Sequence, residues 1–197
     1  MGRNRRFDEQ DVLRSATEVF WQAGFAATSV EDVMQATGLG KGSLYGAFGD
    51  KRTLFHRVFD GYCAHVTAAF SHRLTAANLS AADRLRAMFD TVIASTAGPH
   101  GPPRACLLTK ATAELAATDP DIAALARQTF TAMAEILRVE VAQAQTAGDV
   151  PPHLDARQTA NHLLVVFRGI EALAEAGTET AVLRDAADMA LAQAGLA

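Results

Sequence analysis

The sequence predicts an all-α protein in which a three-helix N-terminal domain is followed by a C-terminal helical bundle, with about nine helices in total. Alanine and leucine dominate the composition, and both residues favour helix. Apolar residues recur at intervals of three and four along most of the chain, and no segment shows the alternation typical of strands. Hydrophobic residues make up 49% and charged residues 20% of the chain, which is typical of a folded globular protein.

The first predicted helix covers residues 8–23. Its apolar residues include Val12, Ala16 and Phe20, which share one face, and Gly24 follows as a plausible stop. The helix therefore has one side suited to burial.

The second predicted helix begins at Thr28 or Ser29, because either hydroxyl can cap a helix N-terminus. Glu31 and Asp32 then place negative charge in the first turn, where the helix dipole favours it. We expect this helix to end at Gly38, since glycine adopts the left-handed C-cap conformation easily.

A third helix is predicted to start at Gly40. Leu44 and Phe48 are four residues apart and are expected to be buried, whereas Lys41 and Tyr45 are expected to face outward. Two short helices joined by a glycine turn form a helix-turn-helix.

Six further helices are expected after residue 50. Asp50 can cap the first of them, and Ser80 with Asp83 resembles a capping box that opens the second. Glycine and proline residues at positions 98–103 predict a loop. The later helices are expected over residues 104–118, 121–147, 155–176 and 178–194.

The segments TSVEDV at residues 28–33 and GLGKGSLY at residues 38–45, followed by Phe48 and Lys51, resemble the DNA-binding signature of the TetR family. The resemblance covers about a quarter of the chain. It implies a DNA-binding domain at residues 1–50 and a ligand-sensing and dimerising domain at residues 51–197. The partners that it implies are double-stranded operator DNA, a small-molecule inducer and a second copy of the chain.

The resemblance assigns three kinds of DNA contact. The hydroxyls at the start of the second helix would hold a phosphate, or serve only as an N-cap. The first residues of the third helix would meet base edges in the major groove, and a tyrosine and a lysine after them would bind phosphates, although such residues can also be plain solvated surface. The assigned residues are Thr28, Ser29, Lys41, Gly42, Ser43, Tyr45 and Lys51.

The sequence departs from the family pattern at Gly46 and Ala47, where larger side chains that touch DNA are usual. Arg3, Arg5 and Arg6 are a candidate arm along the DNA, or else a solubilising tail. Residues 1–57 hold eight Lys or Arg against seven Asp or Glu, whereas the whole chain has a formal net charge of −4. Any nucleic-acid surface is therefore expected in the first segment.

Regulators of this family bind their ligand between the middle helices and dimerise through the last two. A dimer seam is expected from Leu163, Phe167, Ile170 and Ala174, although the same stripe can be an internal core face. The candidate pocket residues are mostly apolar or aromatic, which favours a neutral or hydrophobic ligand. They are Tyr62, Val66, Phe70, Phe89, Cys106, Phe130, Met133 and Phe167.

Cys106 is also a candidate redox sensor. It lies at a predicted helix N-terminus with Arg104 before it and Lys110 one turn after it, and these features stabilise a thiolate. A repressor that senses oxidants or electrophiles through Cys106 is therefore an alternative to one that binds an apolar ligand. A buried cysteine that only packs is the simpler interpretation.

Other classes of protein find less support in the sequence. Two cysteines without CxxC spacing predict reduced thiols. The set Cys63, His65, His100 and Cys106 lacks the spacing of a metal site, so neither metal nor cofactor is expected.

No GxSxG, P-loop or HExxH motif suggests an enzyme. No apolar run is long enough for a membrane span, so the cytoplasm is the expected location. A helical interaction protein without DNA binding is the remaining rival.

Overall fold

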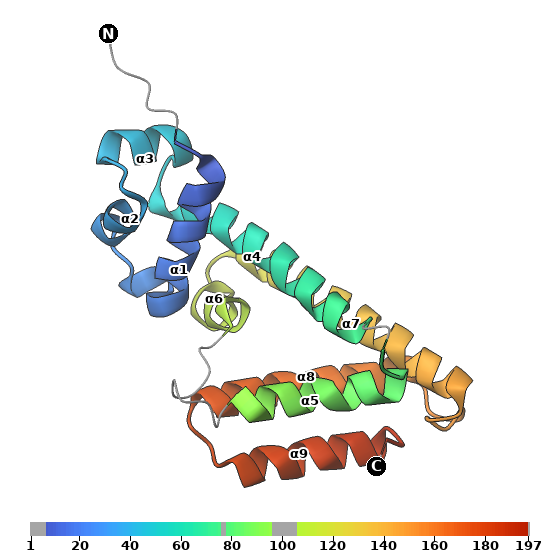
Figure 1. The fold of residues 1–197 in the computed structure, drawn as a ribbon. Helices are drawn as coiled ribbons and strands as arrows, with labels where there is room; N and C mark the ends of the chain where they lie inside the picture. The colour runs from blue at the N-terminus through green and yellow to red at the C-terminus, as the bar shows by residue number, and fades with distance from the viewer. Residues whose placement is uncertain (1–6, 76–77, 96–105, 197) are drawn as a thin grey trace. The chain divides into compact units, whose positions relative to one another are not determined.

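The computed structural model describes residues 7–75, 78–95 and 106–196, and these residues form helices joined by turns, without a strand among them (Figure 1). The expected all-α fold is confirmed. None of the helices in these ranges is long and apolar enough to cross a membrane. The helices are α1 (Glu9–Ala27), α2 (Val30–Thr37), α3 (Lys41–Phe48), α4 (Lys51–Leu74), α5 (Ala81–Ser95), α6 (Leu107–Leu115), α7 (Pro120–Ala147), α8 (Ala156–Glu175) and α9 (Thr180–Gln193).

The predicted capping signals lie at the observed helix ends. Ser29 caps α2, and Gly38 ends that helix in the left-handed conformation with φ 68°. Asp50 Oδ1 accepts a hydrogen bond from the Thr53 N–H at 2.7 Å at the start of α4. Ser80 Oγ accepts one from the Asp83 N–H at 3.0 Å at the start of α5. The side chains next to each boundary thus determine where these helices begin and end.

Gly24 kinks α1 instead of ending it. The residue has φ 81° and ψ 177°, a combination open almost only to glycine, and one further turn continues to Ala27. The expected helix end was therefore misplaced by four residues, from residue 23 to Ala27, because the helix can resume after a glycine that breaks its hydrogen-bond ladder.

The helices pack into two compact units. One comprises Met1–His65 and Cys106–Ala126, and the other comprises Val66–Ala105 and Arg127–Ala197. The division of packing thus falls within α4 and α7, and α6 belongs to the first unit. The functional boundary at residue 50 remains a proposal.

Aromatic side chains form the centre of the first unit. The ring of Phe55 on α4 lies 4.9 Å from that of Phe20 and 5.0 Å from that of Phe25, centroid to centroid. Both contacts are edge-to-face, the arrangement that aromatic quadrupoles favour. They fix α1 against the beginning of α4.

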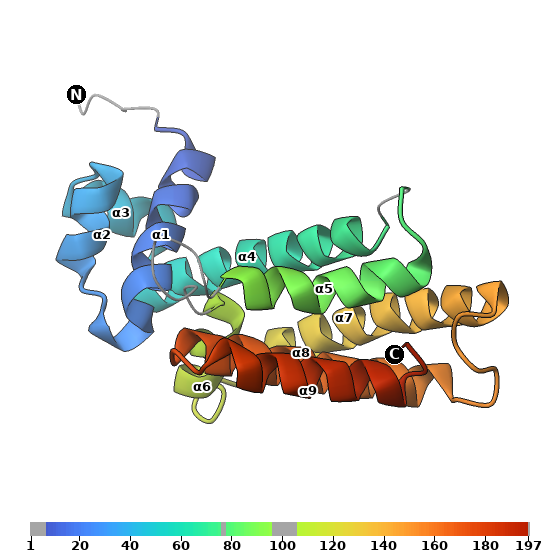
Figure 2. The same cartoon turned by 60° about the horizontal axis from the view of Figure 1, so that its bottom comes forward.

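In the second unit, α5, α8 and α9 lie side by side (Figure 2). The ring of Phe167 on α8 lies 5.8 Å from that of Phe70 and 6.0 Å from that of Phe89. A buried ion pair joins α5 to α7, where Arg84 Nε donates to Glu140 Oε2 at 2.8 Å. The Arg84 guanidinium also donates to the Leu79 carbonyl and to Gln143 Oε1.

Candidate DNA-binding interface

The helix-turn-helix consists of α2, the turn at Gly38 and α3. Val33, Leu44 and Phe48 are buried, as the apolar spacing predicts. The amide of Gly38 donates to the Met34 carbonyl at 2.9 Å, which closes the end of α2 and turns the chain toward α3. The turn therefore holds two short helices with the inner face of each packed.

The outer face of α3 carries the expected polar groups. Lys41, Gly42 and Ser43 are exposed, and Tyr45 is 37% exposed. The Lys41 ammonium lies 5.8 Å from the centroid of the Tyr45 ring, within the range of a cation–π contact. These side chains are accessible to a ligand outside the protein.

The N-terminus of α3 differs from that of α2 in its charge compensation. Gly40 makes no side-chain cap, and the first turn of α3 contains no acidic residue. The first turn of α2, by contrast, contains Glu31 and Asp32. The positive end of the α3 dipole is thus left for an external anion, and Lys41 adds a positive charge beside it.

Gly46 and Ala47, the positions that depart from the family pattern, are also exposed. A Cβ at Gly42 or Gly46 would have no heavy atom within 4 Å. The packing of the protein therefore does not require glycine here. The absence of a side chain at these glycines leaves a surface along α3 that another backbone can approach closely.

Thr28 does not have the exposed position expected of a phosphate ligand. The residue is 1% exposed, and its hydroxyl donates to the Gly24 carbonyl at 2.6 Å. The hydroxyl is therefore engaged within the protein, and a phosphate contact at Thr28 stays a prediction. A threonine one turn after a kink reaches back to the carbonyl that the kink leaves without a helical partner.

Ser29 caps α2 in a reciprocal capping box. Its Oγ accepts from the Asp32 N–H at 3.0 Å, and Asp32 Oδ2 accepts from the Ser29 N–H at 2.8 Å. The hydrogen bonds from Ser29 lower the pKa of the Asp32 carboxyl, so a carboxylate already lies at this helix terminus. The N-cap interpretation is confirmed, while a phosphate contact at Ser29 stays a prediction.

Lys51 binds the protein itself. Its Nζ donates to the carbonyls of Phe25 and Thr28, both at 2.8 Å, and lies 4.3 Å from the centroid of the Phe25 ring. Two of its three N–H donors are thus engaged at the end of α1. The observed role of Lys51 is to join α4 to α1, and the predicted phosphate contact has only the third donor left for it.

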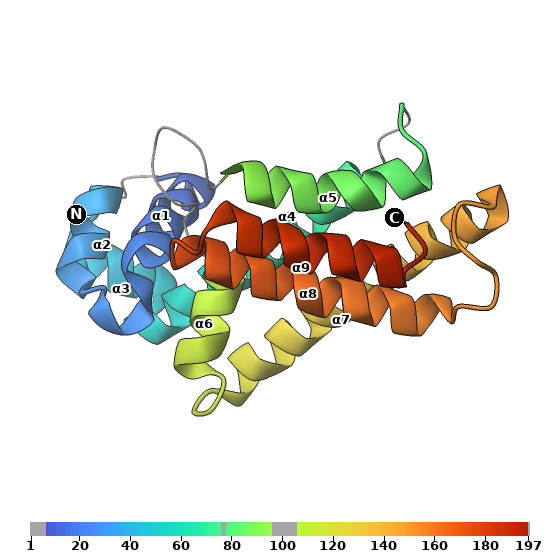
Figure 3. The same ribbon diagram turned by 90° about the horizontal axis from the view of Figure 1, so that it is seen from below.

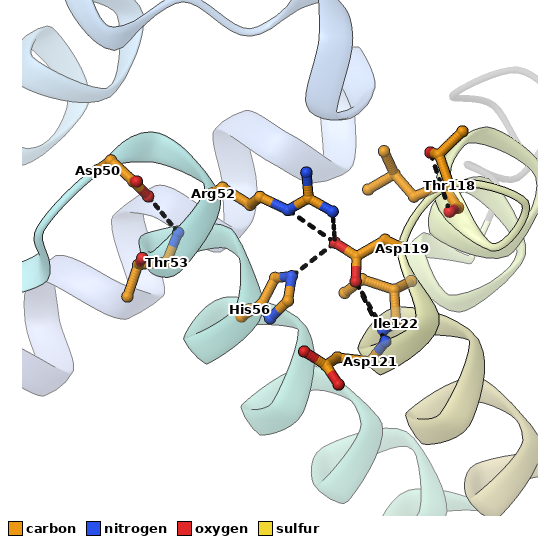
Figure 4. A network of polar contacts seen from close by, with 9 residues as sticks. Asp50, Arg52, Thr53, His56, Thr118, Asp119, Asp121 and Ile122 are labelled. Atoms are coloured by element: carbon orange, nitrogen blue, oxygen red, sulfur yellow. Dashed lines mark hydrogen bonds and ion pairs between the residues drawn. The ribbon is translucent and has the colours of Figure 1, made fainter.

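A polar network that the sequence analysis missed joins α4 to the beginning of α7 (Figure 4). Asp119 Oδ2 accepts from Arg52 Nε at 3.0 Å and lies 2.7 Å from His56 Nε2. Asp119 Oδ1 accepts from the Ile122 N–H at 3.2 Å. The Asp119-Pro120 pair falls between the helices expected over residues 104–118 and 121–147, and it could have indicated this network because proline often follows an N-cap.

The charges around Asp119 are balanced within the protein. Burial raises the pKa of the Asp119 carboxyl, but the hydrogen bonds from His56 and the Ile122 amide outweigh it, and the pKa lies below the usual value. His56, Asp119 and Asp121 offer ligand atoms within 4.8 Å of one another. A metal ion there would compete with Arg52 for the Asp119 carboxylate, so these residues do not form a prepared metal site.

The candidate pocket residues fall into separate groups. Tyr62 and Cys106 contact each other in the first unit. Phe167 contacts both Phe70 and Phe89 in the core of the second unit. The other three are the buried Met133, the half-buried Val66 and the half-buried Phe130.

Two charged residues that sequence reasoning missed, Arg168 and Glu171, lie on α8 in the second unit. The Arg168 guanidinium lies 5.5 Å from the centroid of the Phe130 ring and 2.5 Å from Glu171 Oε2. Burial raises the pKa of Glu171, while the positive charges of Arg168 and Arg73 oppose the shift. Arg168 and Glu171 follow Phe167, a residue of the predicted apolar stripe, by one and four positions. This spacing was the sequence signal that could have identified them.

The expected dimer seam is an internal core face. Leu163, Phe167, Ile170 and Ala174 are all buried within the single chain. The exposed apolar side chains of α8 and α9 lie elsewhere on these two adjacent helices, which Figure 3 shows from below. They are Val165 at 70%, Leu173 at 47%, Val182 at 50% and Met189 at 62% exposure.

Cys106 is half-buried and directly precedes α6. Its Sγ accepts a hydrogen bond from the Tyr62 hydroxyl at 3.3 Å, and Tyr62 Oη accepts one from the Leu107 N–H at 3.2 Å. Lys110 Nζ donates to the Trp21 carbonyl at 3.1 Å. Arg104, His100 and the arm residues Arg3, Arg5 and Arg6 lie outside the described residues.

The packed helix-turn-helix and the open α3 surface define a helix-turn-helix DNA-binding protein. Two family models agree with this class: "Bacterial regulatory proteins, tetR family" matches residues 12–58, and "Tetracyclin repressor-like, C-terminal domain" matches residues 81–193. The second match alone covers more than half of the chain. The chain belongs to the TetR family of DNA-binding transcriptional regulators.

A curated relative agrees with the family, and solved structures agree with the fold. The HTH-type transcriptional repressor ComR of Escherichia coli is 30% identical over 176 residues, which cover 89% of this chain and 83% of ComR. The crystal structure of reduced E. coli NemR superposes with a TM-score of 0.82 at 16% identity, covering 92% of this chain and 93% of NemR. A CifR cysteine mutant bound to operator DNA superposes with a TM-score of 0.77 at 23% identity, covering 97% of this chain and 98% of CifR.

Proposed function

We propose that this protein is a homodimeric repressor that binds operator DNA through the N-terminal half of α3 and is released by a small apolar ligand. The observation that carries the proposal is the open surface formed by Lys41, Ser43 and Tyr45 at a helix N-terminus without an acidic residue or side-chain cap. We place the activity in the bacterial cytoplasm, where such DNA lies, and assign no catalytic reaction. The name of ComR, a repressor of E. coli, supports repression over activation.

Within this surface the residues have different tasks. Lys41 reaches guanine acceptors or a phosphate, Ser43 donates or accepts at a base edge, and the Tyr45 hydroxyl binds a phosphate. Gly42 and Gly46 let the α3 backbone approach the groove closely. Because few long side chains project from α3, we expect base readout to depend mainly on Lys41 and Ser43.

Dimerisation is supported by the exposed apolar side chains of α8 and α9, here called the α8/α9 face: Val165, Leu173, Val182 and Met189. Exposed apolar side chains gathered on adjacent helices favour contact with another protein surface. An operator with two half-sites related by two-fold symmetry requires two DNA-binding domains. A second copy of the chain is therefore the expected partner of the α8/α9 face.

The inducer is proposed to be apolar because the second unit is rich in buried aromatic side chains. Phe70, Phe89 and Phe167 would line the site after some opening of the core, since the Phe167 ring packs directly against the other two rings. Arg168 and Glu171 beside Phe130 would supply polar contacts at its edge. An apolar ligand with one polar end fits this combination.

The DNA-binding proposal predicts different effects for two lysines. Lys41→Ala is expected to lower affinity roughly tenfold for DNA fragments taken from upstream of the protein's own gene, because it removes a contact to DNA, and to leave the midpoint of thermal unfolding unchanged. Lys51→Ala is expected to lower the free energy of unfolding by about 1–2 kcal/mol, because two carbonyls lose their donor. Fluorescence anisotropy across a range of salt measures the first effect. Wild-type affinity of Lys41→Ala at every salt concentration would remove α3 from the interface.

A second candidate signal is oxidation of Cys106, which is favoured by the hydrogen bond from the Tyr62 hydroxyl to its Sγ at the start of α6. Peroxide would oxidise the thiolate to a sulfenic acid and itself be reduced to water. If the thiol is the sensor, mild peroxide releases the wild type from DNA, dithiothreitol restores binding, and Cys106→Ser stays bound. Cys63→Ser, at a buried cysteine, serves as the control. Equal release of Cys106→Ser and wild type would leave the apolar ligand as the inducing signal.

A further inference from the structure

The last turn of α1 together with Thr28, residues 25–28, is here called the junction turn, and it leads from the kink at Gly24 to the cap of α2. It follows the kink at Gly24 and precedes Ser29 directly. Because the helical ladder is interrupted at Gly24, the first amides of the junction turn resemble those of a new helix, which need acceptors from outside the segment.

A side chain that is distant in sequence supplies these acceptors. Glu114 on α6 accepts from the Phe25 N–H at 2.9 Å through Oε2 and from the Ala26 N–H at 2.5 Å through Oε1. A Cβ on Gly24 would lie 3.0 Å from Glu114 Oε2, so the carboxylate fills the space that the missing side chain leaves. One carboxylate thus binds two successive amides from 88 and 89 positions away.

The junction turn is held at its carbonyls as well. Lys51 Nζ on α4 donates to the carbonyls of Phe25 and Thr28. One turn above, Lys110 on α6 donates to the Trp21 carbonyl at 3.1 Å. The chain that leads into α2 is therefore bound on one side by α6 and on the other by α4.

We infer that Glu114 is a positioning residue for operator binding. It sets the direction in which the chain leaves α1, and therefore the placement of the α2–α3 pair, without touching DNA. The inference rests on the proposed DNA-binding function. It adds α6 to the DNA-binding head, meaning α1, α2 and α3, although α6 lies beyond the residues 12–58 that match the family's N-terminal model. In this role α6 is the fourth helix of the head.

Glu114→Gln tests the inference because electrostatics and positioning predict different changes in operator affinity. Glu114→Gln removes one negative charge from the unit that binds DNA, and general electrostatics alone would then leave the affinity unchanged or raise it slightly. Loss of the bidentate carboxylate instead frees the junction turn and is expected to lower operator affinity about fivefold. Asp60→Asn, an exposed acid on α4 in the same unit, is the matched control and is expected to bind as the wild type does or more tightly.

Backbone amide exchange separates positioning from general stability. In Glu114→Gln, exchange at Phe25 and Ala26 is expected to accelerate about tenfold, while exchange in α8 and the midpoint of thermal unfolding stay at wild-type values. Glu114→Asp keeps the charge on a shorter side chain and is expected to recover part of the affinity. If Glu114→Gln binds the operator as tightly as Asp60→Asn does, the inference is wrong. Failure of the wild type to bind the same DNA would overturn the proposed function instead.

Discussion

Leu173→Glu is expected to give monomers and to lower operator affinity by about 100-fold or more. Leu173 is 47% exposed on the α8/α9 face, where a buried carboxylate in a dimer interface would have no partner. Two heads on one operator benefit from a high effective concentration, which a monomer loses entirely. Sedimentation and anisotropy measure the two effects on the same sample.

Val139→Glu is the matched control for this experiment, since Val139 is a 40% exposed apolar residue on α7, outside the α8/α9 face. It is expected to remain dimeric and to bind operator DNA as the wild type does. Phe167→Asp would be a poor probe of dimerisation because Phe167 is 5% exposed in the single chain, so a charge there disrupts the core. An intact dimer for Leu173→Glu would place the interface on another surface.

Glu140→Ala is expected to destabilise the second unit by about 3–5 kcal/mol, because it leaves the buried guanidinium of Arg84 without its counter-charge. The side chains of the pair are 9% and 2% exposed for Arg84 and Glu140, so water cannot replace the lost partner. Urea unfolding followed by circular dichroism measures the loss.

Glu135→Ala provides the comparison on the same helix. Glu135 pairs with Arg138 at the surface, where ion pairs contribute little, and its removal is expected to cost less than about 1 kcal/mol. Replacing both partners of the buried pair, Arg84→Met with Glu140→Leu, is expected to recover most of the stability that Glu140→Ala loses. Equal destabilisation by Glu135→Ala and Glu140→Ala would contradict the assignment of a buried ion pair.

The helix-turn-helix was predictable because its signals are local. Ser29 and Gly38 act within one turn of their own positions, and the i, i+4 pair Leu44 and Phe48 needs only the helical period to share a face. The outward direction of Lys41 and Tyr45 follows from the same period. Family resemblance added the role of these residues, which periodicity alone does not contain.

Predictions that depended on distant partners were less successful. Lys51 was expected to point to DNA, but the carbonyls that it binds belong to residues 23 and 26 positions earlier. Phe167 was placed in both the seam and the pocket. Its burial against Phe70 and Phe89 within the single chain removes it from the seam, while its place in the pocket stays a prediction. An apolar stripe shows that a helix face is buried and does not show what covers it.

The sequence by itself determined the all-α class, the helix-turn-helix and the exposed residues of its third helix, because caps, glycine turns and helical periodicity act between neighbours. Only the tertiary structure shows that the Thr28 hydroxyl points into the protein, that Asp119 contacts Arg52 and His56, and that Glu114 binds the amides of the junction turn. A buried or orphaned polar group takes whichever donor or acceptor the fold brings near it, and that partner can lie at any distance along the chain.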